Sequence, residues 1–105
     1  MIRSSPVAAA LLALAAPAAL AQQALLARNL AATCANCHGT LGIARGEMKS
    51  IAGQPAAQLL QALADFKSGA RPSAVMQQIT KGYTDEQLRL IAGHYAALPP
   101  GKAMP

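Results

Sequence analysis

Three observations predict an all-α domain of about four helices. Apolar residues recur at helical spacing in several segments of the 105-residue chain. Capping residues and prolines stand where these segments begin and end. No segment shows the alternating β-branched pattern that is typical of a strand. We therefore expect helices that pack directly on one another, without a sheet.

The first residues have the pattern of an export signal. Arg3 supplies a positive charge, and the apolar run of Val, Ala and Leu that follows is interrupted by Pro17. Ala19-Leu20-Ala21 fits a small-x-small cleavage site. The apolar run is shorter than the ~20 residues that a membrane-spanning helix needs. We expect a cleaved secretory signal peptide over residues 1–21 and one periplasmic domain over residues 22–105, with no stable membrane insertion after cleavage.

Composition limits the partners and the core of this domain. Without Arg3, eight Lys and Arg residues stand against four acidic ones, a formal charge of +4 that favours an acidic partner surface. The cations do not cluster and aromatic residues are few, so we do not expect nucleic-acid binding. An 84-residue domain without Trp buries little surface. We expect a disulfide, a metal or a prosthetic group to complete its core.

The first expected helix spans residues 22–35. Its apolar residues recur on one face: Leu25, Leu26, Leu30 and Ala31. Four glycines punctuate a loop that runs from His38 to Gly53.

The second expected helix begins at Gln54-Pro55, with Pro55 at the first helical position, and stops at Gly69. Its apolar face consists of Leu59, Leu60, Leu63 and Phe66.

Two further helices are predicted from their caps. Ser73 can cap a short helical segment that ends at about Lys81. The segment from Thr84 to Gln87 forms a capping box with acidic residues in the first turn, and the helix that it opens ends before Pro99. The apolar face of this last helix consists of Leu88, Ile91, Tyr95 and Leu98.

The stretch A-T-C-A-N-C-H-G-T contains the only two cysteines of the chain, Cys34 and Cys37, followed at once by His38. Three interpretations compete. A thiol-redox pair belongs on a strand-to-helix turn of an α/β fold, for which the chain has no strands. A structural zinc site needs four ligands, and His94 alone cannot complete one.

Covalent haem c is the third interpretation, because C-x-x-C-H is its attachment signature. The two thiols add to the haem vinyl groups, and the histidine that follows lies under the iron as an axial ligand. We expect one haem c, bound covalently by Cys34 and Cys37 and axially by His38.

The chain also resembles a known family, through four segments in this order: Cys34-Ala35-Asn36-Cys37-His38-Gly39, Ile51-Ala52-Gly53-Gln54, Phe66-Lys67-Ser68-Gly69, and Lys81-Gly82-Tyr83-Thr84-Asp85-Glu86. It is similar to the small class I c-type cytochromes of bacteria. The stretch from Phe66 to Glu86 is most similar to the cytochrome subunit of flavocytochrome c sulfide dehydrogenase. The resemblance implies the class I cytochrome c fold, with about four helices wrapped around one covalently bound haem.

The resemblance also implies that Met76 is the second axial ligand. Met76 lies 38 residues after His38 and beyond a whole helix, so the chain is long enough to reach the opposite face of the haem. Met48 lies only ten residues after His38 in a glycine-bounded loop, and Met104 lies in the Pro/Gly-rich tail. The alternative for Met76 is a role as core filling.

Two positions bear on the axial ligands. His94 could replace Met76 to give a bis-histidine haem, but we expect a solvated or half-buried side chain. The family usually carries a proline whose carbonyl holds the ring N–H of the proximal histidine, and Lys49 occupies that position here. A backbone carbonyl is available from any residue, so His38 can still be oriented, although the loop loses the rigidity of a fixed φ.

Two axial ligands leave the iron no free coordination site, so we expect outer-sphere electron transfer and not an enzyme. The resemblance implies that the protein accepts electrons from a flavoprotein sulfide dehydrogenase subunit and passes them to a downstream carrier. The alternatives are a free periplasmic carrier that serves an oxidase or another dehydrogenase, and a ligand-binding or peroxidatic haem protein.

Candidate surface residues follow from this function. Val75, Ile79 and Tyr83 are candidates for contact with the flavoprotein. Five basic residues are candidates for steering a partner or meeting the haem propionates, the alternative being ordinary solvated charges: Arg45, Lys49, Lys67, Arg71 and Lys81.

Overall fold

The computed structural model describes residues 6–46 and 48–101, so Arg3 and Met104 lie outside the described residues. The elements in chain order are α1 (Pro6–Ala31), a 3-10 turn (Ala32–Cys34), α2 (Ala35–His38), α3 (Ala56–Ser68), α4 (Ala74–Lys81) and α5 (Asp85–Ala96). Neither described range contains a strand. The prediction of an all-α fold is confirmed.

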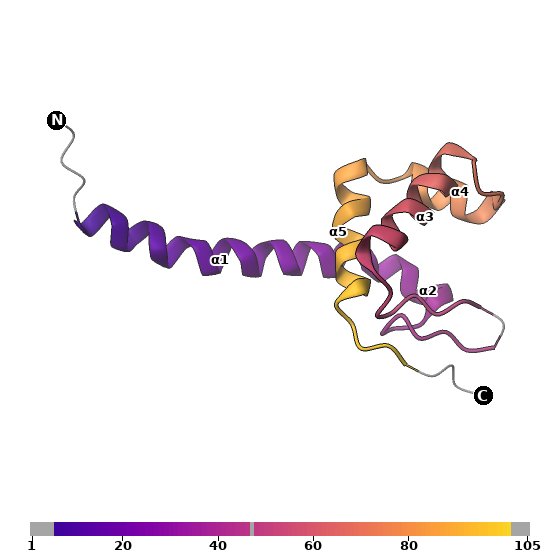
Figure 1. The fold of residues 1–105 in the computed structure, drawn as a ribbon, viewed down its shortest axis with the longest axis horizontal. Helices are drawn as coiled ribbons and strands as arrows, with labels where there is room; N and C mark the ends of the chain where they lie inside the picture. Colours follow the sequence, from indigo (N-terminus) through magenta and orange to yellow (C-terminus); the bar gives the residue numbers. More distant parts are fainter. Residues whose placement is uncertain (1–5, 47, 102–105) are drawn as a thin grey trace.

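Helix α1 is longer than the helix expected over residues 22–35. It runs without a break through Pro17 and projects from the other helices as a rod (Figure 1). Residues 6–26 are exposed. By length and composition the stretch Pro6–His38 could cross a membrane, a test that a signal sequence near the N-terminus also passes. Residues 6–21, the described part of the expected signal peptide, therefore make no part of the packed core.

The face that α1 presents to the core differs from the expected one. Leu25 and Leu26 are 55% and 50% exposed, whereas Ala27 and Ala31 are buried. Leu30, on the same helical face as the two alanines, packs against the same core, and so does Cys34 in the 3-10 turn that follows. The prediction for Leu25 and Leu26 was wrong because the small alanines, and not the leucines, let the end of α1 approach α5 closely.

Helix α3 begins one residue later than expected. Pro55 has an extended ψ of 133°, so it lies before the helix as its N-cap, and its carbonyl accepts the N–H of Leu59 at 3.1 Å. The end is as predicted: Gly69, with φ +88°, caps the helix in the left-handed region.

Helices α4 and α5 begin at the predicted caps. The Ser73 hydroxyl accepts the backbone N–H of Met76 at 3.2 Å. At the start of α5, Thr84 and Gln87 exchange the two hydrogen bonds of a capping box, at 2.9 and 3.1 Å. Both helices therefore have their first turns fixed by local side chains.

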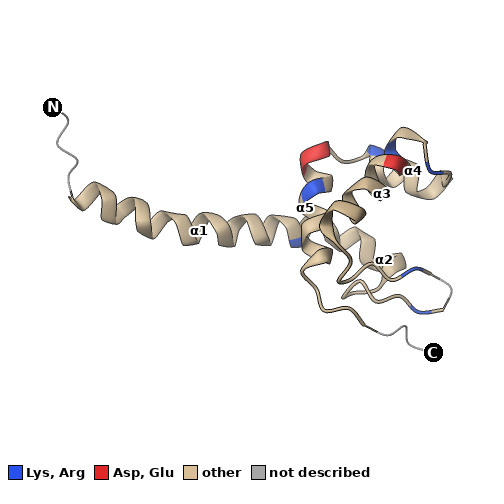
Figure 2. Ribbon diagram, in the orientation of Figure 1, with Lys and Arg blue, Asp and Glu red and all other residues tan. Residues whose placement is uncertain are grey.

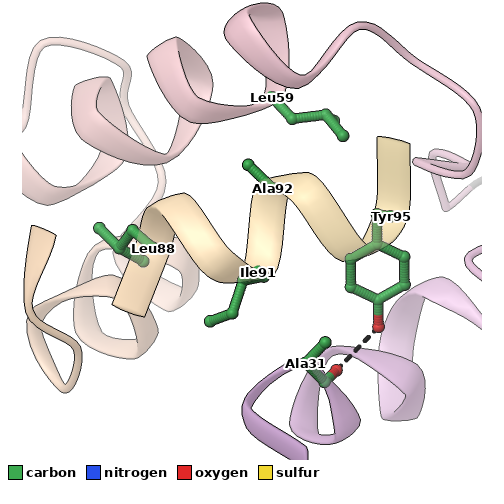
Figure 3. Packing of buried hydrophobic residues seen from close by; sticks show 6 residues of the cluster. All are labelled: Ala31, Leu59, Leu88, Ile91, Ala92 and Tyr95. Atoms are coloured by element: carbon green, nitrogen blue, oxygen red, sulfur yellow. Dashed lines mark hydrogen bonds between the residues drawn. The ribbon is translucent and has the colours of Figure 1, made fainter. Parts of the chain in front are cut away.

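The core is thin and centres on α5, which lies between α1 and α3 (Figure 3). Its buried cluster consists of Ala31, Leu59, Leu88, Ile91, Ala92 and Tyr95. Among the described residues, Tyr95 and Thr80 are the largest fully buried side chains. The core therefore depends on one aromatic residue and a few aliphatic ones.

Tyr95 joins α5 to α1. Its hydroxyl donates a hydrogen bond of 2.8 Å to the carbonyl of Ala31, 64 residues away in the sequence (Figure 3). Burial, and next the neighbouring Cys34, raise the pKa of Tyr95 to about 12. The folded state therefore favours the protonated phenol, which can donate this bond.

Tyr95→Phe removes the hydroxyl and leaves the ring in place. We expect the free energy of unfolding at pH 8 to fall by about 1–2 kcal/mol, because a buried carbonyl loses its donor. The phenol ionises near pH 10 in the unfolded chain and near 12 in the folded one. The wild type should therefore lose stability between pH 10 and 12, and the variant should lose less. Urea unfolding at pH 8 and 11 measures both effects, and an equal loss in the two proteins would contradict the assignment.

Candidate functional site

A cavity of about 590 Å³ lies beside the thin core. Its lining comes from the turn before α2, α2 itself, the loop after it, and helices α3, α4 and α5. The volume is in the range of small-molecule and cofactor sites, roughly 300–1,000 Å³. The walls are mainly apolar, and Leu63, Phe66 and Ile91, which we assigned to the helix core faces, are part of them.

The structure brings the cysteine motif to this cavity. Cys34 ends the 3-10 turn, and Cys37 and His38 lie in the single turn of α2. All three residues line the cavity. Gly39 ends α2 with φ +88°, and a Cβ there would lie 2.0 Å from the carbonyl oxygen of Ile43. Only glycine therefore allows the chain to turn away directly after His38.

His38 has a fixed ring orientation. Its Nδ1 lies 2.6 Å from the carbonyl oxygen of Lys49. A carbonyl can only accept, so Nδ1 carries the proton and Nε2 keeps its lone pair for a metal. The expectation that Lys49 can replace the proline of the family in this role is confirmed.

The loop that carries Lys49 is tied to the core on one side. The N–H of Ile51 donates to the carbonyl of Gly42 at 2.8 Å, and the N–H of Gly53 donates to the carbonyl of Tyr95 at 2.9 Å. Gly42, with φ +71°, packs against the Tyr95 ring, where a Cβ would lie 2.8 Å from the ring carbon Cδ1. Backbone hydrogen bonds close to Lys49 therefore hold its carbonyl in place.

Two methionines line the cavity, Met48 and Met76, whereas the sequence favours only Met76 as the second axial ligand. Met76 is half-buried in the first turn of α4, and Met48 is 47% exposed in the loop. The separation of ten residues between His38 and Met48 argues against Met48 as the second ligand. The loop folds back after α2, and this is a tertiary feature that the spacing does not reveal.

His94 lies outside the cavity lining, as expected. It is half-buried, with its ring centroid 5.1 Å from that of Tyr95 in an edge-to-face arrangement. Burial, with Arg28 nearby, lowers the pKa of His94. The neutral imidazole is therefore favoured at this position on α5.

The candidate partner residues divide into two groups. Val75 and Ile79 line the cavity and are 64% and 39% exposed. Tyr83 is half-buried outside the cavity lining: it packs against the core, and its hydroxyl is bonded at 2.5 Å to the hydroxyl of Thr33, which does line the cavity. Val75 and Ile79 are therefore the exposed members of the expected apolar surface at the cavity, and the role of Tyr83 stays a prediction.

Of the five basic candidates, Lys49 and Arg71 line the cavity. The Arg71 guanidinium lies 5.3 Å from the ring centroid of Phe66. Lys67 is instead paired with Asp85 at 3.0 Å. Figure 2 shows basic segments on the loop after α2 and on the turn between α3 and α4, and acidic segments in α3 and at the start of α5. Neither Lys49 nor Arg71 takes part in the two salt bridges found among the described residues, Lys67–Asp85 and Arg89–Glu86.

The two competing interpretations of the cysteines have little support. Burial raises the pKa of the Cys34 thiol, whereas thiol-redox chemistry depends on a lowered one. Over residues 6–46 and 48–101, no group of three or more His, Cys, Asp or Glu side chains could hold a metal ion. Haem fits the site: two thiols and an oriented imidazole adjoin an apolar cavity that a thioether also reaches.

Comparison with known proteins agrees with this site. The chain is 44% identical over 69 residues to the cytochrome subunit of sulfide dehydrogenase of Chlorobaculum tepidum. That alignment covers 66% of this chain and 63% of the relative. It is 30% identical over 71 residues to cytochrome c-553 of Desulfomicrobium norvegicum. That alignment covers 65% of this chain and 89% of the relative. A solved structure of cytochrome c4 from Acidithiobacillus ferrooxidans matches with a TM-score of 0.60 and 34% identity, over 62% of this chain and 38% of that one.

A third relative is the thiosulfate dehydrogenase electron acceptor of Stutzerimonas stutzeri, 37% identical over 70% of this chain and 35% of that protein. The chain thus spans less than two thirds of the length of some relatives that it matches. No family model matches the chain. The cytochrome c-553 match covers nearly the whole relative, and the relatives are named as cytochromes or, in one case, as an electron acceptor. The chain therefore belongs to the small c-type cytochromes, which are electron-transfer proteins and not enzymes.

Proposed function

We propose that this chain is an exported electron carrier with a single haem c, reduced by a flavoprotein sulfide dehydrogenase subunit and oxidised by a downstream carrier. Cys34 and Cys37 hold the haem covalently, and His38 and Met76 are its axial ligands. Bound haem supplies a one-electron iron couple. The observation that carries the proposal is the convergence of these four residues on one apolar cavity.

The residues around the cavity have separate tasks in this proposal. The Lys49 carbonyl keeps the His38 ring in one orientation through the 2.6 Å bond to Nδ1. The apolar walls exclude water and favour the less charged ferrous state. Two axial ligands leave no coordination position on the iron for a substrate, so electrons pass through an exposed edge of the haem. Outer-sphere transfer requires only that the two redox states differ little in structure.

The proposal includes export. Residues 1–21 serve as the signal peptide and are removed, and residues 22–105 form the single mono-haem domain in the periplasm. The support is the exposed, apolar first part of α1, which contributes nothing to the core.

The electron donor is proposed from one relative, which is named a cytochrome subunit of sulfide dehydrogenase. Val75 and Ile79 offer an exposed apolar surface at the cavity, and Lys49 and Arg71 are basic residues beside it. This combination suits a partner that is apolar at the point of electron entry and acidic around it.

The ligand assignment is tested by a pair of methionine variants. In Met76→Ala, the oxidised protein should lose the sulfur-to-iron charge-transfer absorption, because the axial thioether is gone. In Met48→Ala, the matched control from the same cavity, the band should persist. Visible and near-infrared absorption spectra measure both. Loss of the band in Met48→Ala alone would assign the ligand to the loop.

Haem attachment is tested in a Cys34→Ala, Cys37→Ala double variant. We expect it to lose most of its helical circular dichroism, because the cavity would lose the group that fills it and the remaining core is thin. Wild-type chain produced without haem should behave in the same way. Native helicity in the double variant would show that the domain folds without its cofactor.

The donor is tested by affinity purification of the tagged protein from its own periplasm, followed by anaerobic addition of sulfide. A flavoprotein should copurify, and the haem α-band should show reduction at a catalytic rate. Val75→Asp should weaken this association, since it places a charge on the apolar surface. Leu41→Asp is the control, because Leu41 is 61% exposed and lies outside this cavity. Purification of the cytochrome alone, still oxidised after sulfide, would identify a free carrier instead.

A further inference from the structure

The first turn of α4 carries Met76 and is held by one side chain. Ser73 precedes the helix in an extended conformation, with φ −172° and ψ 112°, and acts as its N-cap. Its hydroxyl oxygen accepts the backbone N–H of Met76 at 3.2 Å. Met76 is therefore the third residue of the helix, the position whose N–H an N-cap side chain satisfies.

The two ends of α4 are anchored to different degrees. Near the C-terminal end, Thr80 is 1% exposed and donates its hydroxyl to the Met76 carbonyl at 2.7 Å. At the N-terminal end, Ala74 and Val75 are exposed. The helix packs against α3. The turn that carries Met76 has no buried side chain and lies at the end of a short helix, and helix ends fray first.

We propose that Ser73 is a positioning residue that keeps the Met76 sulfur in the axial position. The inference rests on the proposed function, which makes Met76 a ligand. Met76 can leave the haem if the first turn of α4 unwinds, and the Ser73 cap opposes that unwinding. Loss of an N-cap raises the equilibrium constant for unwinding of the first helical turn by about five-fold.

The state of the first turn of α4 decides between two kinds of haem chemistry. While the turn is wound, the axial site is closed and the protein can only exchange electrons. When the turn unwinds, a coordination position opens and a small diatomic ligand can enter. The Ser73 hydroxyl therefore helps to keep the protein an electron carrier.

Three variants test this inference. Ser73→Ala removes the cap, and Ser73→Asn restores a capping side chain without adding charge. Thr84→Ala is the matched control: it removes an equivalent N-cap bond, from Gln87 to Thr84 at 3.1 Å, on α5, which carries no proposed ligand.

The readout is the rate at which carbon monoxide binds to the ferrous protein at neutral pH, well below the melting temperature. We expect Ser73→Ala to bind about five times faster than the wild type, and Ser73→Asn and Thr84→Ala to bind at the wild-type rate. The charge-transfer absorption of Ser73→Ala should also disappear at a lower temperature than that of Thr84→Ala.

Other results would overturn the inference. A wild-type rate in Ser73→Ala, or an equal acceleration in Thr84→Ala, would show that the cap has no specific effect on Met76. The Met76→Ala spectrum separates this failure from failure of the proposed ligand. If that variant keeps the charge-transfer band, Met76 is not the ligand; if it loses the band while Ser73→Ala is unaffected, only the role of Ser73 is wrong.

Discussion

Tyr95 connects the parts of the chain that build the site. Its hydroxyl donates to Ala31 in α1, three residues before the first cysteine of the motif. Its backbone carbonyl accepts the N–H of Gly53, which closes the loop that carries Lys49. Its ring packs on Gly42 in the same loop and lines the cavity. Through this one residue, α5 sets the positions of the cysteine motif and of the carbonyl that orients His38.

A domain arranged in this way has an interior that its own side chains do not fill. The apolar faces of α3 and α5 are shared between a small buried cluster and a cavity of about 590 Å³. Leu59 and Ile91 belong to both. A covalently held cofactor in that cavity would therefore act as part of the core, which is how a domain of this size can be stable with so few large buried residues.

The two sides of the proposed haem site are built differently. On the histidine side, the carbonyl of Lys49 is fixed by a loop that is hydrogen-bonded to the core at Gly53. On the methionine side, Met76 is half-buried in the first turn of a short helix, directly after the exposed Ala74 and Val75. The surface proposed for partner contact, with Val75 and Ile79, lies on the same helix. In the proposed function, α4 therefore provides both the partner surface and one axial ligand.

Local signals in the sequence determined much of this protein. The C-x-x-C-H motif indicated haem, and the caps at Ser73 and Thr84 predicted where α4 and α5 begin, because caps and attachment motifs act over a few residues. The tertiary structure alone decided which face of α1 is buried, that Met48 joins Met76 at the cavity, and that the Tyr83 hydroxyl bonds to Thr33. The reason is that these outcomes depend on contacts such as Tyr95 to Ala31, 64 residues apart, which residue spacing does not encode.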